Sequence, residues 1–233
     1  MKREQNKIKI KSEQEYDAAY NESIKNPDLF WSKIANRINW YKKWDTVSNV
    51  DFNKAQIRWF EGARLNVSYN CLDRHIEEGY ADEIALIWEG NDPTEDKKYT
   101  YSELLDEVSR FSNVLKSLGV EKGDRVCIYM QMIPELTISM LACARIGAVH
   151  SIVFGAFSAE SLRDRINDSK CKILITQDTG VRGTKDNIPM KENADIAISE
   201  CPSISNVIVV KRTGVNVEIN ENIDIWWHKS ISN

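Results

Sequence analysis

Three short apolar runs, with helical segments between them, fill the stretch VCIYMQMIPELTISMLACARIGAVHSIVFGAFSAESLRDRINDSKCKILIT, residues 126–176. Each run has the length of a buried strand, and the segments between the runs are long enough for helical crossovers. The sequence therefore predicts an α/β fold with a mainly parallel, doubly wound sheet. The three predicted strands are Val126–Met130, Val149–Phe154 and Lys172–Thr176.

Two helices connect these strands, and the alternation continues beyond them. Pro134 opens a nearly all-apolar helix, PELTISMLACARI, and Ser158 caps a second helix that we expect to reach about Asp168. A helix near residues 190–200 then leads to NVIVVK, residues 206–211, which we interpret as a fourth parallel strand. The pattern of the remaining residues is less regular.

A smaller pattern precedes the sheet. Two short runs, residues 84–88 and 99–101, flank the polar turn NDPTEDKK and predict a hairpin-like pair of strands. Ser102 is the expected cap of a helix that continues to about Leu118 and stops at Gly119.

The first part of the chain lacks this alternation of strands and helices. We expect a helical, partly irregular amino-terminal extension over residues 1–76 and the sheet-bearing domain over residues 77–233. Four of the seven tryptophans belong to the extension, and we interpret them as packing anchors rather than as a stacking platform for bases. They are Trp31, Trp40, Trp44 and Trp59.

Two helices are predicted within the extension. Ser12 followed by Glu15 is a capping-box pattern for a helix through roughly Ile24. Asn26 and Pro27 suit the cap and first turn of a second helix. The apolar residues expected on this second helix are Leu29, Phe30, Ile34 and Ile38.

Composition excludes several classes of partner. The 233 residues are 42% hydrophobic, enough for a real core, and 31 basic and 35 acidic residues leave a net charge of −4. Such a charge favours neither nucleic acid nor an anionic membrane as a partner, so any anion site must be local. The longest apolar stretch, residues 136–154, is interrupted by polar residues, and we expect a soluble protein.

The five cysteines are odd in number and widely spaced, which is typical of reduced core thiols. We therefore expect a cytoplasmic protein. The three scattered histidines do not predict a metal site, because metal ligands usually cluster at short spacings.

A basic bend, GVRGTK at Gly180–Lys185, follows the third predicted strand. Arg182 could form a bidentate pair with a phosphate or carboxylate, and Lys185 could add a point charge at the end of a long side chain. Gly180 and Gly183 allow backbone conformations that turn amide donors toward the same anion. Ligands of open α/β sheets collect at the carboxyl ends of the strands, so the bend is a candidate anion site. On the motif alone, a solvated turn is the more common interpretation.

No catalytic signature accompanies the bend. The sequence contains no GxGxxG, no GxxxxGK[ST] and no GxSxG, so a nucleoside triphosphate lacks its usual glycine-rich cradle. From its residues alone, the chain is an α/β protein with one candidate anion site and no assigned catalytic group.

Four blocks of sequence carry a family resemblance. They are RWFEGARLNVSYNCLDRHI at residues 58–76, GDRVCIYMQMIPELTISMLACARIGAVHSIVFGAFSAESLRDRI at 123–166, ILITQDTGVRGTK at 173–185, and IDIWWH near the end. These blocks resemble the AMP-forming acetate–CoA ligases (acetyl-CoA synthetases) of the adenylate-forming enzyme superfamily. The first 50 residues match more loosely, in the manner of that family's amino-terminal extension.

The resemblance implies a two-step ligation. Acetate and ATP, with Mg²⁺, first give acetyl-adenylate and pyrophosphate, and the thiol of coenzyme A then displaces AMP. The family match implies no catalytic residue and no metal ligand on this chain, but it implies two segments that contact coenzyme A. The implied contacts are Phe154, Gly155, Ala156, Arg182, Gly183, Thr184 and Lys185.

Two of these residues depart from the family pattern. Thr184 and Ala156 stand where relatives often carry glycine, and a backbone angle open only to glycine would be strained there. We expect both residues to be tolerated.

The chain stops at Asn233, before the Ser/Thr/Gly-rich phosphate loop, the acetate pocket and the mobile carboxyl-terminal domain of the family would begin. We therefore expect the amino-terminal portion of the ligase, which contributes scaffold and the coenzyme A loop and is inactive by itself. Alternatively, the chain is a non-catalytic α/β binding module that complements a separately encoded carboxyl-terminal remainder of the ligase, because a divided sheet leaves an unpaired edge. A third interpretation is an α/β domain whose resemblance is only ancestral.

Overall fold

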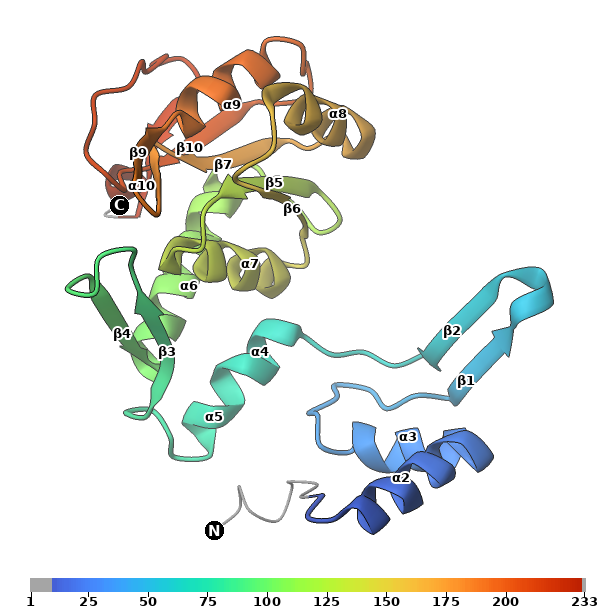
Figure 1. The fold of residues 1–233 in the computed structure, drawn as a ribbon. Helices are drawn as coiled ribbons and strands as arrows, with labels where there is room; N and C mark the ends of the chain where they lie inside the picture. The colour runs from blue at the N-terminus through green and yellow to red at the C-terminus, as the bar shows by residue number, and fades with distance from the viewer. Residues whose placement is uncertain (1–9, 232–233) are drawn as a thin grey trace. The chain divides into compact units, whose positions relative to one another are not determined.

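The computed structural model describes residues 10–231, which form two compact units. One unit extends to Asn66, and the other begins at Val67 (Figure 1). The domain division expected after residue 76 stays a prediction. Among the described residues, no helix combines the length and the apolar character needed to cross a bilayer.

Both helices predicted in the first unit are present, as α2 (Glu13–Lys25) and α3 (Pro27–Ala35). Ser12 caps α2, because its hydroxyl accepts a hydrogen bond from the N–H of Glu15 at 3.2 Å. The Glu15 carboxylate accepts from the N–H of Lys11 at 2.7 Å, one residue before the cap. The second hydrogen bond of the predicted capping box therefore comes from the N–H of Lys11 instead of the N–H of Ser12.

The second helix is shorter than predicted. It ends at Ala35, whose carbonyl accepts from the N–H of Ile38 at 3.1 Å in a tight turn. Ile38, predicted on the helix, therefore lies beyond it. Asn26 occupies the cap position without a side-chain hydrogen bond, and Pro27 begins the helix where no N–H partner is needed.

A β-hairpin follows that the sequence pattern did not indicate. Strands β1 (Thr46–Asp51) and β2 (Gln56–Glu61) are antiparallel and are joined by the 3-10 turn η1 (Phe52–Lys54). Val50 lies opposite Ile57 in this ladder, and both side chains are exposed. Neither strand buries one face regularly, so the alternation that marks a half-buried strand is missing from the sequence.

The tryptophans of the first unit contact other aromatic rings, and the predicted packing role is confirmed for the half-buried Trp40 and Trp44. The ring centroid of Trp40 lies 5.3 Å from that of Trp44 and 5.5 Å from that of Phe60. Trp31 and Trp59 meet edge to face at 6.3 Å and stay partly exposed. Such edge-on pairs are favourable for aromatic rings.

The second unit begins with two short helices, α4 (Val67–Cys71) and α5 (Asp73–Glu77). The predicted hairpin follows as the antiparallel strands β3 (Ile84–Glu89) and β4 (Asp96–Thr100).

The next helix, α6, spans Tyr101–Ser117, and the prediction of Ser102 as its cap is wrong. Thr100 is the cap: its hydroxyl accepts from the N–H of Glu103 at 3.1 Å, and the Glu103 carboxylate accepts from the N–H of Thr100 at 2.8 Å. This reciprocal pair needs a Glu or Gln three residues after the cap. Ser102 is followed at that spacing by Leu105, which cannot reciprocate.

Five parallel strands form the central sheet of the second unit, in the order β11-β10-β7-β5-β6. Strands β10, β7, β5 and β6 are labelled in Figure 1. This sheet confirms the α/β fold, and all four predicted parallel strands are present. The fifth, β11, has only three residues and lies where the sequence pattern is irregular. The strands are β5 (Arg125–Met130), β6 (Val149–Phe154), β7 (Ile173–Gln177), β10 (Asn206–Val210) and β11 (Asp224–Trp226).

Helices cover both faces of this sheet (Figure 1). Helix α7 packs with α6 on one face, and α8 packs with α9 on the other. The bounds are Pro134–Ile146 for α7, Ala159–Ser169 for α8, Met190–Ile198 for α9 and Trp227–Ser230 for the short α10.

Side chains of β5 alternate between the two cores. Val126 and Ile128 belong to the core on the α6 and α7 face, whereas Cys127 and Tyr129 belong to the core on the α8 and α9 face. All four are fully buried. A strand covered on both faces needs apolar residues at every position, which explains the continuous apolar runs.

All five cysteines are free thiols. Four are buried, as predicted, and Cys71 is exposed. Burial raises the pKa of Cys143 to about 12, which keeps that thiol protonated at neutral pH. The cytoplasmic location stays a prediction.

The direction of winding reverses beside β5. The chain passes from β5 to its neighbour β6 and then to β7 on the other side of β5. In such sheets a crevice forms outside the carboxyl ends of the strands at the point of reversal. Directly after β7 comes a small antiparallel hairpin of β8 (Gly180–Arg182) and β9 (Lys185–Ile188), which contains the basic bend.

Candidate functional site

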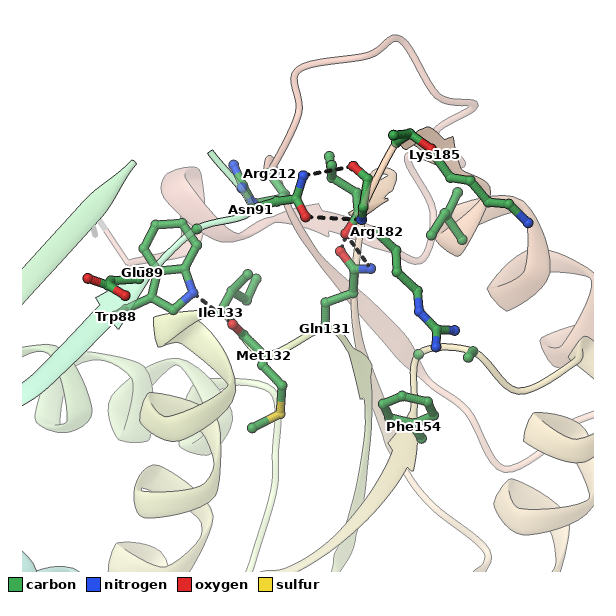
Figure 2. Close-up of a pocket in the computed structure, with 17 residues that line it drawn as sticks. Trp88, Glu89, Asn91, Gln131, Met132, Ile133, Phe154, Arg182, Lys185 and Arg212 are labelled. Atoms are coloured by element: carbon green, nitrogen blue, oxygen red, sulfur yellow. Dashed lines mark hydrogen bonds between the residues drawn. The ribbon is translucent and has the colours of Figure 1, made fainter. Parts of the chain in front are cut away.

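A cleft of about 910 Å³ opens at the carboxyl ends of the sheet strands (Figure 2). Its walls come from the segments that follow β5, β6, β7 and β10, together with the end of β3 and the turn after it. Both segments that the sequence analysis selected, Phe154–Ala156 and Arg182–Lys185, line this one cleft. The sheet topology therefore brings together residues that are almost 30 positions apart in the sequence.

The bend has a glycine at its tip. Gly183 has a φ of 59°, in the left-handed region that favours glycine. Neither Thr184 nor Ala156 adopts a positive φ, so neither residue is strained. The expectation that both substitutions for glycine are tolerated is confirmed for the backbone.

Arg182 and Lys185 are exposed side chains of the cleft. Within the described part of the chain, neither forms a salt bridge with a carboxylate. In Figure 2 the side chain of Arg182 runs from the bend toward Phe154, whereas that of Lys185 points away from it. An anion that enters the cleft can therefore meet positive charges that no ion pair neutralises.

A third cation of the cleft, Arg212, is already paired. Its guanidinium contacts the two carboxylate oxygens of Glu95 at 2.6 and 3.4 Å and lies 5.2 Å from the centroid of the Trp88 ring. The hydrogen bond from Arg212 lowers the pKa of Glu95 below the usual value for a glutamate. Arg212 therefore helps to build the wall of the cleft, and its charge is largely balanced.

A buried carboxylate fixes the backbone around Arg212. Asp178, directly after β7, accepts hydrogen bonds from the successive N–H groups of Arg212 at 2.9 Å, Thr213 at 3.1 Å and Gly214 at 2.8 Å. Successive N–H groups that converge in this way form a concave anion site, which the protein fills with its own side chain. The loop after β10 is thereby tied to the end of β7.

Apolar side chains form another part of the wall. Phe154 is 56% exposed and Met132 is 74% exposed, although both are large hydrophobic residues. The indole Nε1 of Trp88 donates to the carbonyl oxygen of Met132 at 2.7 Å, which joins the β3 hairpin to the segment after β5. The cleft thus offers apolar surface close to exposed cations, a combination that suits an anion with a flat or apolar portion.

Sequence reasoning missed several residues of the cleft. Trp88, Asn91, Gln131 and Arg212 all line it, yet none has a local motif. They reach the cleft from the β3 hairpin and from the ends of β5 and β10, so only the pairing of distant strands brings them together.

His150 lies in β6 outside the cleft lining, and burial lowers its pKa. In the part of the chain that the structure describes, no three His, Cys, Asp or Glu side chains are grouped closely enough to hold a metal ion.

Comparison with known proteins agrees with this architecture. The family model described as "AMP-binding enzyme" matches residues 72–230, and the model described as "Acetyl-coenzyme A synthetase N-terminus" matches residues 16–71. Over 222 residues, 95% of this chain, the sequence is 51% identical to an acetyl-coenzyme A synthetase of Magnetococcus marinus. Over 218 residues, 93% of this chain, it is 54% identical to an acetyl-coenzyme A synthetase of Saccharophagus degradans.

The chain spans about a third of the length of these relatives, because each match covers 34% of the relative. The two family models together account for most of the described residues. The chain therefore belongs to the family of AMP-binding enzymes and corresponds to an amino-terminal portion of acetyl-coenzyme A synthetases.

Proposed function

We propose that this chain supplies the scaffold and the coenzyme A docking loop of an AMP-forming acetate–CoA ligase. The observation that carries the proposal is the meeting of Phe154–Ala156 and Arg182–Lys185 in one cleft. The phosphates at the nucleotide end of coenzyme A suit a guanidinium and an ammonium that form no salt bridge with any described residue. Exposed apolar side chains beside them suit the flat base of the same ligand.

In the proposed reaction, acetate and ATP form acetyl-adenylate and pyrophosphate, and the coenzyme A thiol displaces AMP. The residues of this chain bind and orient coenzyme A for the second step. We assign ATP, Mg²⁺ and acetate to other parts of the ligase, because the cleft has neither a glycine-rich phosphate cradle nor a cluster of metal-binding side chains among the described residues.

Because the bend is exposed, we expect substitutions of its cations to change the coenzyme A affinity only modestly. A charge-assisted contact is worth about 1–3 kcal/mol when it is partly buried and about 0.2–1 kcal/mol when it is exposed. Arg182 and Lys185 are exposed in an open cleft, so the lower range applies. We expect each single substitution to alanine to weaken coenzyme A binding about two- to fivefold, and the double substitution about tenfold.

Isothermal titration of the purified chain with coenzyme A tests this proposal. The variants are Arg182→Ala, Lys185→Ala and their combination, and Lys116→Ala is the control, since Lys116 is an exposed lysine on α6 outside the cleft. Pantetheine, which lacks the phosphorylated nucleotide, is the second ligand, and its affinity should not respond to any variant. Unaltered affinity for coenzyme A in the double variant would remove the docking role.

The second candidate function is a binding module that complements a separately encoded remainder of the ligase. Strand β6 lies at the end of the strand order, and its side chains Val149 and Ile152 are 52% and 45% exposed. Exposed apolar residues on an edge strand favour a partner. Sedimentation of the isolated chain tests this alternative: self-association or aggregation supports it, and a stable monomer argues against it.

Neither candidate predicts ligation by the isolated chain. An assay of acetate-dependent pyrophosphate release should show no activity, because the proposed sites for ATP and acetate lie in other parts of the ligase. Measurable release by the pure chain would contradict both candidates.

A further inference from the structure

Two side-chain amides hold the basic bend in place (Figure 2). Asn91 Nδ2 donates to the carbonyl oxygen of Gly183 at 2.8 Å, and the N–H of Gly183 donates to Asn91 Oδ1 at 3.0 Å. Gln131 Nε2 donates to the carbonyl oxygen of Val181 at 3.1 Å, and the N–H of Val181 donates to Gln131 Oε1 at 3.0 Å. Each amide thus satisfies both backbone groups of one residue.

The Gln131 contact takes the place of a neighbouring strand beside β8, and the Asn91 contact holds the turn after β8. Val181 lies within β8, and its backbone groups point to the edge that β9 does not occupy. Gly183, with its φ of 59°, is the first residue of the turn between β8 and β9. The other edge of β8 pairs with β9 through Gly180 and Arg182. One edge of β8 is therefore held by β9 and the other by the Gln131 amide, whereas the Asn91 amide holds the turn that follows β8. Arg182 lies between the two residues that the amides hold.

Gly180 supplies independent support for the contact with Gln131. A Cβ atom on Gly180 would lie 2.6 Å from Gln131 Cδ, and its three nearest atoms would all belong to the Gln131 amide. Gly180 does not have a positive φ, so its backbone does not require glycine. The amide itself occupies the space that a side chain at this position would need.

Gln131 is in turn positioned by the end of β7. The backbone N–H of Gln131 donates to Oε1 of Gln177 at 2.8 Å, and Nε2 of Gln177 donates to the carbonyl oxygen of Thr179 at 2.8 Å. Gln177 is fully buried, so its side chain has one fixed arrangement. The ends of β5 and β7 and the bend are joined by one network of amides.

We propose that Asn91 and Gln131 are positioning residues, which fix the bend so that Arg182 is presented to the cleft. A hairpin of two strands with three and four residues is too short to be stable by itself. Without the amides, the bend would sample many conformations, and a ligand would have to order it on binding. This inference rests on the proposed docking function for its ligand, but the contacts can be tested without any ligand.

Hydrogen exchange of single backbone amides, followed by NMR on the purified chain, is the direct test. Asn91→Ala should accelerate exchange at the N–H of Gly183, and Gln131→Ala should accelerate exchange at the N–H of Val181, each by about tenfold or more. Asn113→Ala is the control, because Asn113 is an exposed amide on α6 outside the cleft. Unchanged exchange at both sites would overturn the proposal.

A double-mutant cycle separates the contact from general damage to the fold. Gly180→Ala should displace the Gln131 amide and accelerate exchange at Val181 as Gln131→Ala does. When Gln131→Ala is already present, the space is free, and adding Gly180→Ala should change little further. Additive effects of the two substitutions would contradict the contact.

Coenzyme A titration of the same variants links the contacts to the ligand. Asn91→Ala and Gln131→Ala should each weaken coenzyme A binding about two- to fivefold and leave pantetheine binding unchanged. Faster exchange with unaltered coenzyme A affinity would overturn the positioning role. If the unaltered chain does not bind coenzyme A, the proposed docking function fails, while the exchange measurement still decides whether the amides hold the bend.

Discussion

Three cations that lie close together in the sequence have opposite environments, since one is buried and two are exposed. Lys191, in the first turn of α9, is 1% exposed, and its ammonium lies 2.8 Å from an oxygen of Asp224 and 2.6 Å from an oxygen of Asp195. Arg182 and Lys185, in the hairpin that precedes α9, are exposed and form no salt bridge in the part of the chain that the structure describes.

The cost of desolvation explains this difference. A buried ammonium is stable only when it has carboxylate partners, because removal of a charge from water costs several kcal/mol. An exposed cation keeps its water and needs no internal partner. Lys191 therefore holds α9 against β11 through Asp224, and Arg182 and Lys185 remain available for a ligand.

The largest expected effect on stability comes from removing the buried ammonium of Lys191. Lys191→Met leaves the carboxylate of Asp224, whose side chain is 1% exposed, without its cation. We expect the free energy of unfolding to fall by about 3–5 kcal/mol, measured by urea denaturation. Lys98→Met is the matched control, because the salt bridge of Lys98 with Asp96 is exposed on both sides, and it should cost about 0–1 kcal/mol. Equal losses in the two variants would contradict the contrast between buried and exposed cations.

Stability should also depend on pH, because folding raises the pKa of one carboxylate and lowers the pKa of another. Burial raises the pKa of Asp195, although Lys191 acts against the rise. The contribution of Asp195 to stability is therefore fully present below its usual pKa of 3.8 and is lost as the pH rises through the higher value of the folded state. The Arg212 hydrogen bond lowers the pKa of Glu95, so the contribution of Glu95 is present above the usual 4.5 and is lost as the pH falls through the lower folded value.

NMR titration of the two side-chain carboxylates checks both directions. In the Lys191→Met variant, the pKa of Asp195 should rise further, because the hydrogen bond that lowers it is removed. In an Arg212→Gln variant, the pKa of Glu95 should return toward the usual value for a glutamate. A shift of either pKa in the other direction would contradict the effect assigned to its cationic partner.

The smallest expected effect on stability is at the bend. Arg182→Ala and Lys185→Ala remove exposed side chains that form no salt bridge among residues 10–231, so each should change the free energy of unfolding by no more than about 0.5 kcal/mol. Urea denaturation of the variants used for coenzyme A titration makes this measurement. A loss above about 1 kcal/mol would mean that the cations stabilise the fold itself.

Helices and central strands follow well from the sequence where one local signal is enough. Ser158 caps α8 as predicted, and its hydroxyl accepts from the N–H of Ser161. The apolar run of β7 is buried at every position. The cap of α6 was misplaced by two residues because Thr100 and Ser102 compete, and the reciprocal hydrogen bond with Glu103 selects Thr100.

Elements with weak local signals were missed. Strands β1 and β2 bury neither face regularly, and β11 has three residues whose place depends on pairing with β10. For the candidate site, the basic bend and Phe154 were found, but Asn91 and Gln131 were not. Asn91 meets Gly183 across 92 positions of sequence, and Gln131 meets Val181 across 50.

Local chemistry was thus sufficient for the alternation of strands and helices, because a sheet buried on both faces requires continuous apolar runs and helices require caps. The order of the strands, the burial of Lys191 and the amides that hold the bend depend on contacts between distant residues. Desolvation and hydrogen-bond geometry at those contacts exist only once the chain has folded, so they leave no local pattern in the sequence.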